Sequence, residues 1–319
     1  MTNSTSSPMR LFPRGLVWSP PVRRAALLGV LGYALLAGCS ALDERQRQWI
    51  FQPSSASWGN TATEAQGMQD VWIDFHSRVA NAPVRLHALW MPHERADAPV
   101  LLYLHGARWG VAGSAPRIRR MQALGFHVLA IDYRGFGRST PALPSEATAH
   151  EDAVAAWDWL AARHPGAPRY VFGHSLGGAI AVHLASEVDG VAGLMVEGTF
   201  SSVPDVFATM RWGWLPVSWL ITQRFDSAER IGKVRAPVLV VHGSDDRLIL
   251  PSLGRRLYER ARGPKLWVLV PGGTHHNTHD LGLAEYERAL RQLFALPAGA
   301  KASSHARRTP APVTHVRRG

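Results

Sequence analysis

The chain has 319 residues, of which 46% are hydrophobic, so it can bury a large core in one or two domains. Its formal net charge of +11 lies mainly at the two ends, because residues 1–38 and 297–319 contain basic residues and no acidic ones. Residues 39–296 keep a formal charge of only +2. Nucleic-acid binding requires a clustered basic face on the folded domain, so the composition argues against a nucleic-acid-binding protein.

The first 38 residues have the pattern of an export signal: arginines, an apolar run over residues 25–36, and then small residues. The run ends in Leu36-Ala37-Gly38-Cys39, which resembles the bacterial lipobox, and Cys39 is the only cysteine. We therefore expect a lipoprotein signal peptide over residues 1–38 and a membrane anchor on Cys39. The alternatives are a plain cleaved signal or an uncleaved anchor, with Cys39 incidental. Ser40 in place of an aspartate favours the outer membrane among the lipoproteins that the motif resembles.

Two further segments are expected to lie outside the folded body. Residues 39–70 contain scattered small and polar side chains and are predicted to be a tether. Residues 297–319 are rich in Ala, Pro, Ser, His and Arg and show no apolar periodicity, which predicts a basic disordered tail. The folded domain is then expected over residues 71–296.

Eight apolar runs predict the strands of that domain. Residues 71–75 and 84–90 alternate apolar and polar side chains, as a half-exposed antiparallel pair does. The following runs are apolar at nearly every residue and cover 100–104, 128–131, 170–172, 193–196, 238–241 and 266–270. Such runs are typical of parallel strands covered on both faces, so we expect an α/β fold with helices on both sides of a mostly parallel sheet.

Five segments between the runs predict helices, at about residues 114–124, 148–163, 177–188, 252–262 and 281–294. One interval, residues 200–235, is too long for a single helix and contains Trp212, Trp214 and Trp219. We expect it to form a short cap. Its tryptophans either enclose the substrate or attach the insertion to the body.

Gly173-His174-Ser175-Leu176-Gly177 matches the G-x-S-x-G pattern between a strand and a helix. A sharp strand-to-helix turn needs small flanking residues, and it presents the serine hydroxyl at the carboxyl end of the sheet. A serine nucleophile also requires an imidazole base and an acid that orients it, in the chain order serine, acid, histidine. Acid and base candidates do follow strands in that order, in residues 242–246 and 271–277.

These motifs together make residues 71–294 resemble the α/β-hydrolase superfamily, in the branch of serine aminopeptidases and monoacylglycerol lipases. The matching segments are His105-Gly106-Ala107, Asp132 to Ser139, Gly173 to Gly177, His242 to Asp246 and Gly273-Thr274-His275.

The resemblance implies Ser175 as the nucleophile, His275 as the general base and Asp246 as the orienting acid. His276 and Asp245 are the alternatives for the base and the acid. The resemblance places the oxyanion-binding N–H groups on Leu176 and Ala107. It also implies that Asp132 and Arg134 support the site, whereas His279 is expected on the surface.

The sequence therefore predicts an exported serine hydrolase that cleaves carboxylic esters, either short-chain or monoacylglycerol-like, through an acyl-enzyme on Ser175. The expected partners are a small ester substrate and the membrane that holds Cys39. An aminopeptidase-like amide hydrolase and a non-catalytic binding module on the same fold are the alternatives. The sequence shows no cysteine–histidine cluster, paired helical histidines or phosphate loop, so neither a metal nor another cofactor is expected. It gives no indication of the oligomeric state.

Overall fold

The eight apolar runs form one sheet in the order β1-β2-β4-β3-β5-β6-β7-β8. The structure is a computed structural model and describes residues 20–53 and 65–296. The strands are β1 (Gln69–Ser77), β2 (Ala82–Met91), β3 (Val100–Leu104), β4 (His127–Ile131), β5 (Arg169–His174), β6 (Val191–Glu197), β7 (Val238–Gly243) and β8 (Lys265–Val270).

The pairing of the strands confirms the predicted fold class. β1 pairs with β2, and β2 with β4, in antiparallel register. All other neighbours are parallel, from β4 through β3 and β5 to β8. The carboxyl ends of the parallel strands therefore meet at one edge of the sheet, which is where the loops that carry the candidate catalytic residues begin.

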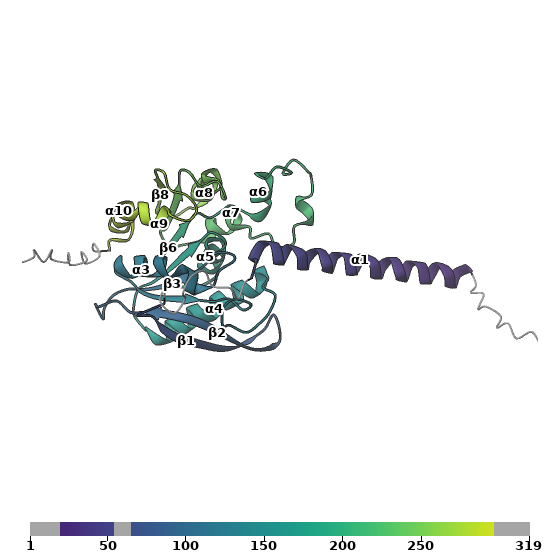
Figure 1. The fold of residues 1–319 in the computed structure, drawn as a ribbon, viewed down its shortest axis with the longest axis horizontal. Helices are drawn as coiled ribbons and strands as arrows, with labels where there is room; N and C mark the ends of the chain where they lie inside the picture. The colour runs from purple at the N-terminus through teal and green to yellow at the C-terminus, as the bar shows by residue number, and fades with distance from the viewer. Residues whose placement is uncertain (1–19, 54–64, 297–319) are drawn as a thin grey trace, which may run out of the picture. The chain divides into compact units, whose positions relative to one another are not determined.

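Helices cover the sheet, and the predicted ones occur at the predicted places (Figure 1). The helices are α1 (Pro20–Phe51), α3 (Ala115–Ala123), α4 (Glu146–Arg163), α5 (Leu176–Glu187), α6 (Val203–Ala208), α7 (Ser227–Arg230), α8 (Pro251–Arg260), α9 (Thr278–Leu281) and α10 (Leu283–Phe294). The 3-10 turns are η1 (Val111–Ser114), η2 (Ser218–Leu220) and η3 (Ile231–Lys233).

The core lies in two layers, one on each face of the sheet. Along β3, Leu102 and Leu104 belong to one buried cluster, and Leu101 and Tyr103 to the other. The first cluster also contains residues of α4, α5 and α8, whereas the second contains residues of α3 and α10. Successive side chains of a strand point to opposite faces, so a strand buried on both faces is apolar at every position.

The N-terminal helix α1 crosses a boundary between two compact units, residues 1–44 and 45–319. Cys39 lies in the first unit and is exposed. Residues 1–19 of the expected signal peptide and the expected tail 297–319 lie outside the described residues. Among the helices that the structure describes, none is both long and apolar enough to cross a membrane.

The expected tether over residues 39–70 is wrong at its beginning, because α1 continues to Phe51 and its last turns belong to the second unit. The Phe51 side chain is fully buried and packs edge-on against Phe225, with ring centroids 5.9 Å apart. Arg47 donates a hydrogen bond to the main-chain oxygen of Pro144 at 2.8 Å. Burial of the phenylalanine thus makes this segment part of the folded body. Residues 54–64 lie outside the described residues.

The expected cap insertion contains α6, η2, α7 and η3, joined by turns. Val206 and Ile221 pack against the core and fix the two sides of the insertion. Trp212, Trp214 and Trp219 point into solvent, with 56%, 74% and 76% of their surface exposed. These tryptophans do not attach the insertion to the body.

Candidate active site

Ser175 occupies a strained turn between β5 and α5. Its backbone has φ 55° and ψ −123°, a conformation that side-chain-bearing residues seldom adopt. Two hydrogen bonds hold the turn against β6: Ser175 N–H donates to the oxygen of Glu197, and the Thr199 hydroxyl donates to the oxygen of Ser175, both at 2.9 Å. The hydroxyl of Ser175 is thereby presented at the carboxyl edge of the sheet.

The glycines of the motif are required by close backbone contacts. A Cβ atom on Gly173 would lie 2.2 Å from the oxygen of Gly177, and a Cβ on Gly177 would lie 2.1 Å from the oxygen of Leu104. Both distances are far below van der Waals contact, so a side chain at Gly173 would force β5 away from the start of α5, and one at Gly177 would force α5 away from the end of β3. The pattern G-x-S-x-G thus has a steric cause at each glycine.

The structure brings Ser175, His275 and Asp246 together. The His275 Nε2 lies 3.0 Å from the Ser175 Oγ, and its Nδ1 lies 2.8 Å from Asp246 Oδ2. His275 and Asp246 are both buried. The arrangement can take a proton from the serine hydroxyl and stabilise the imidazolium that results.

Several hydrogen-bond donors around Asp246 keep its side chain ionised as a carboxylate. Its Oδ1 accepts hydrogen bonds from the N–H groups of Leu248 at 3.0 Å and Ile249 at 2.9 Å. Burial raises the pKa of Asp246, but interactions with His242 and His275 outweigh burial and hold that pKa well below its usual range. The neighbouring alternative, Asp245, is exposed and accepts a hydrogen bond from Ser244.

The alternative base, His276, lies beside the site without reaching the serine through any hydrogen bond that the structure shows. Its ring meets that of His275 edge-on, with centroids 5.3 Å apart. His276 lines the cavity above Ser175. Burial, together with the charges of His275 and Arg117, lowers the pKa of His276. The side chain is therefore placed to contact a ligand.

The loop that follows β3 passes directly over the nucleophile. A Cβ atom on Gly106 would lie 3.1 Å from the Ser175 Cβ, so the glycine permits this approach. Ala107 is the next residue and lines the same cavity as Ser175. Leu176 is the first residue of α5, and a first-turn N–H has no partner within its helix. Both N–H groups expected to bind an oxyanion thus belong to segments that border the serine.

Sequence reasoning missed Arg117, which positions the histidine loop. Its Nε donates to Glu197 Oε1 at 3.0 Å, and its Nη2 donates to the main-chain oxygens of His275 and His276, both at 3.2 Å. The Glu197 side chain is buried and also accepts a hydrogen bond from the Tyr286 hydroxyl at 2.6 Å. An arginine within a predicted helix carries no sequence signal for such a role.

His174 and His279 are both buried. The buried His174 donates from Nε2 to the oxygen of His275 at 3.0 Å, so it supports the loop rather than facing the serine. Burial holds the pKa of His174 well below its ordinary value, which keeps the ring neutral. The expectation that His279 lies on the surface is wrong: it is 4% exposed, because the chain turns into α9 directly after the histidine loop.

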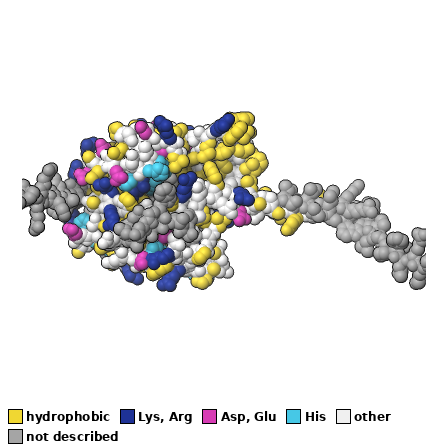
Figure 2. Space-filling view, viewed as in Figure 1, with side chains coloured by type: hydrophobic (Ala, Val, Ile, Leu, Met, Phe, Trp, Pro, Cys, Tyr) yellow, Lys and Arg dark blue, Asp and Glu magenta, His cyan; other side chains and the backbone are white. Residues whose placement is uncertain are grey.

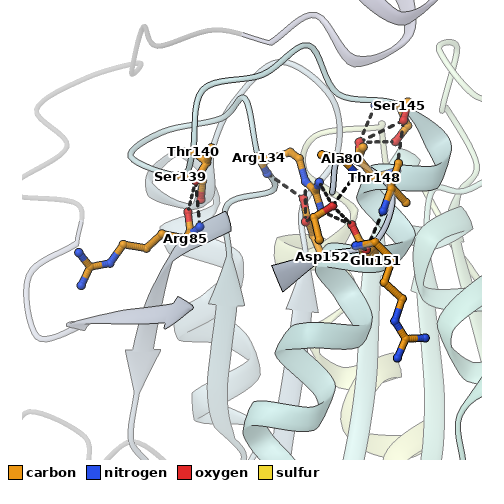
Figure 3. A network of polar contacts seen from close by, with 12 residues as sticks. Ala80, Arg85, Arg134, Ser139, Thr140, Ser145, Thr148, Glu151 and Asp152 are labelled. Carbon is orange, nitrogen blue, oxygen red and sulfur yellow. Dashed lines mark hydrogen bonds and ion pairs between the residues drawn. The ribbon is translucent and has the colours of Figure 1, made fainter. Parts of the chain in front are cut away.

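Asp132 and Arg134 support the surroundings of the site through buried polar contacts. Asp132 accepts a hydrogen bond from the N–H of Val111 at 2.8 Å. Arg134 contacts Asp152 through its main-chain N–H, Nε and Nη2, and its Nη2 also reaches Glu151 at 2.6 Å (Figure 3). These ion pairs join the turn after β4 to α4.

A cavity of about 160 Å³ opens above Ser175. Its lining includes Gln52, Arg108, Trp109, Arg117, Leu248 and His276. The tryptophans of the insertion are not part of the lining, so enclosure of substrate by them is not seen. Gln52 was not predicted, because it lies in the segment that the sequence indicated as a tether. Among the described residues, no group of three or more His, Cys, Asp or Glu side chains is placed to hold a metal.

Comparisons with known proteins agree with the class that this fold and site define. Residues 95–228 match the family model described as serine aminopeptidase, S33. An uncharacterized protein of Mycobacterium tuberculosis is 31% identical over 262 residues, which are 80% of this chain and 90% of that protein. The chain therefore belongs to the α/β-hydrolase superfamily.

One further relative and one solved structure of similar fold have names that state an activity. The lysophosphatidylserine lipase ABHD12 of Danio rerio is 32% identical over 190 residues, which are 54% of this chain and 49% of that protein. The structure of the Pyrococcus furiosus esterase Pf2001 superimposes with a TM-score of 0.58 at 18% identity, over 75% of this chain and 96% of that one. At this identity the esterase shows the shared fold alone.

Proposed function

We propose that the protein is a serine hydrolase that cleaves carboxylic esters through an acyl-enzyme on Ser175. The observation that carries the proposal is the continuous chain of contacts from Ser175 Oγ through His275 to Asp246, at 3.0 and 2.8 Å. A serine hydroxyl is a weak nucleophile unless a base of this kind accepts its proton. The hydrolase family to which the chain belongs supports the same reaction class.

In the proposed reaction, His275 Nε2 accepts the proton of Ser175 while Oγ attacks the ester carbonyl carbon. The oxyanion of the tetrahedral intermediate accepts hydrogen bonds from the N–H groups of Leu176 and Ala107. Removal of one such donor costs about 2.7–4 kcal/mol of transition-state stabilisation in other enzymes. His275 then gives the proton to the departing alcohol. Water, activated by the same imidazole, releases the acid and restores the serine.

The cavity lining favours an ester over an aminoacyl substrate. An aminopeptidase needs an acidic group to hold the substrate ammonium, and no Asp or Glu occurs among the described residues that line the cavity. The charged lining residues are Arg108 and Arg117. We infer a neutral or anionic substrate, either a short-chain ester or a single-chain glycerolipid ester. The name of the Danio rerio relative, a lysophosphatidylserine lipase, is consistent with the second class.

A fluorophosphonate probe tests the reaction class directly. Labelling of the purified chain at Ser175, together with its loss in Ser175→Ala, is the expected result. Ester turnover is expected to fall by as much as about 10⁶-fold in that variant. Ser186→Ala is the matched control. The Ser186 hydroxyl donates a hydrogen bond to the main-chain oxygen of His183, and Ser186 does not line the cavity above Ser175. An unlabelled wild-type protein would favour the alternative of a binding module.

Ester and amide substrates are separated by a panel of p-nitrophenyl acyl esters of increasing chain length beside aminoacyl p-nitroanilides. We expect turnover of the esters only. Faster cleavage of the anilides would assign the protein to the peptidases instead.

We further propose that Cys39 carries a lipid that attaches the exported protein to a membrane, with the outer membrane favoured by Ser40. The lipobox-like sequence Leu36 to Cys39 supports this proposal. Mass spectrometry of the mature amino terminus tests it. A diacylated or triacylated Cys39 at the first position is expected, and an unmodified cysteine or cleavage elsewhere contradicts it.

A further inference from the structure

The insertion between α6 and α7 exposes a concentrated apolar surface. Met210, Trp212, Trp214 and Trp219 are 39%, 56%, 74% and 76% exposed, all within ten consecutive residues. Figure 2 shows hydrophobic side chains gathered on this part of the molecule, in the region where Figure 1 places the chain after α6. Contiguous exposed aromatic surface of this kind marks an interaction site. We call residues 209–221 the tryptophan loop.

The tryptophan loop is firmly attached at its ends. Val206, which precedes the loop, and Ile221, its last residue, pack against the core. Gln46 donates from Nε2 to the oxygen of Leu220 at 2.8 Å, and its Oε1 accepts from the N–H of Thr222 at 2.8 Å. The exposed indoles are therefore presented by a supported loop whose base is part of the folded body.

The polar groups of the tryptophan loop are largely paired within the loop itself. Gly213, Leu215 and Leu220 donate their N–H groups to the oxygens of Met210, Trp212 and Val217 at 2.9, 3.0 and 2.9 Å. The indole N–H of Trp219 donates to the oxygen of Pro216 at 3.0 Å. Backbone groups that enter a lipid phase unpaired cost several kcal/mol each. A loop with this internal pairing can lie in a membrane interface at little cost.

The tryptophan loop carries positive and no negative charge, which favours binding to an anionic surface. Residues 206–225 contain no Asp or Glu, and Arg211 stacks over the Trp212 ring with its guanidinium carbon 5.5 Å from the ring centroid. Tryptophan is enriched at the boundary between lipid headgroups and acyl chains, where its ring is buried and its polar edge is solvated. An adjacent arginine adds attraction to anionic headgroups.

We propose that the tryptophan loop docks on the surface of an anionic lipid bilayer, with its three indoles inserted at the headgroup level. The lipid anchor proposed at Cys39 would also place the protein on a bilayer, which agrees with this docking surface. Six residues lie between Cys39 and Gln46, and the seven Cα–Cα steps that join them cannot span more than about 25 Å. A lipidated Cys39 thus keeps the base of the tryptophan loop within reach of the same bilayer. The proposal itself does not depend on the hydrolase reaction.

The test uses the full chain in a Cys39→Ser background, labelled with an environment-sensitive fluorophore at Trp214→Cys. Vesicles of phosphatidylglycerol and phosphatidylcholine, with brominated acyl chains in a parallel set, are then added. The label at position 214 is expected to shift its emission to the blue and to be quenched by the bromines. The same label at Arg235→Cys is expected to do neither, because Arg235 lies at the opposite, amino ends of the strands and its side chain is 91% exposed.

A sedimentation assay supplies the second readout. The triple variant Trp212→Ser, Trp214→Ser, Trp219→Ser is expected to bind the vesicles at least about tenfold more weakly than wild type. Trp72→Ser on β1 is the matched control and is expected to bind like wild type. Equal binding of the triple variant, or an unchanged label at position 214 while the protein sediments, would overturn the proposal. A blue shift that follows protein concentration without vesicles would also overturn it, and would assign the loop to a contact between two copies of the chain.

Discussion

Arg117 donates a hydrogen bond to the main-chain oxygen of His275, the residue whose side chain faces Ser175. His174 donates to the same oxygen from its Nε2, at 3.0 Å. The imidazole of His275 is thus fixed twice, through its ring nitrogens by Ser175 and Asp246 and through its main chain by α3 and β5. A base within hydrogen-bond reach of its nucleophile depends on such support, because small misplacements cost a large part of the rate.

Replacement of Arg117 by Met is expected to destabilise the fold by about 3–5 kcal/mol, because it leaves the buried carboxylate of Glu197 without its cation. The double variant Arg117→Met, Glu197→Gln should recover most of that stability in a urea titration, since Gln still accepts the hydrogen bond of Tyr286. Its kcat should nevertheless remain roughly tenfold to a hundredfold below wild type, with KM less affected. A fully active double variant would show that Arg117 has only a structural role.

Separate substitutions of His275 and His276 distinguish the roles of the two histidines. His275→Ala is expected to lower kcat by several orders of magnitude, because no other imidazole is within hydrogen-bond distance of the serine in the described chain. His276→Ala should raise KM or alter substrate preference while most of kcat remains, since His276 lines the cavity. Steady-state kinetics on one ester checks both. The reverse result would move the base to His276.

The close backbone contacts of Gly177 predict that a side chain there is not tolerated, whereas one at Gly263 is. Gly177→Ala should prevent folding or remove activity, because its Cβ would lie 2.1 Å from the oxygen of Leu104 and 2.5 Å from that of His105. Gly263→Ala is the control, since its Cβ would meet nothing nearer than 3.6 Å. Thermal unfolding and fluorophosphonate labelling of both variants give the comparison. A stable, fully labelled Gly177→Ala would refute the steric explanation of the motif.

The strands and the loops that follow them could be predicted from the sequence, because the strands of a parallel sheet buried on both faces are apolar at nearly every residue. The positions of Ser175, Asp246 and His275 followed from motifs at the ends of those runs. Arg117 and Phe51 could not be placed in this way, since their roles depend on contacts with residues far away in the chain. The exposure of Trp212 and Trp214 also could not be predicted, because the sequence does not distinguish an exposed tryptophan from one in the core or in a pocket lining.

Stability is expected to fall below neutral pH because two partly buried histidines, His150 and His183, bind protons when the chain unfolds. Burial lowers the pKa of His150 to about 2 and that of His183 to about 4, from an ordinary value of 6.5. The two rings stack with centroids 3.4 Å apart. Between these folded-state values and 6.5 the unfolded chain binds more protons, so the free energy of unfolding decreases as the pH falls.

The slope from His150 is expected to approach at most about 1.4 kcal/mol per pH unit well below pH 6.5, with a smaller contribution from His183, because both rings are partly solvated. Urea titrations from pH 7 to pH 5 measure it. His150→Phe should flatten the dependence by about that slope, whereas the exposed His76→Gln should leave it unchanged. An unaltered slope in His150→Phe would place the acid sensitivity in other groups.

The hydrogen bond from the N–H of Arg108 to the oxygen of Phe51, at 2.9 Å, joins the last residue of α1 to the loop beside Ser175. Arg108 also donates from Nε to the Gln52 side chain at 2.7 Å. The last turn of α1 and the residue after it therefore help to hold one wall of the cavity above Ser175. A proteolytic cut before Arg45 should therefore preserve ester turnover, whereas a cut a few residues later should lower it.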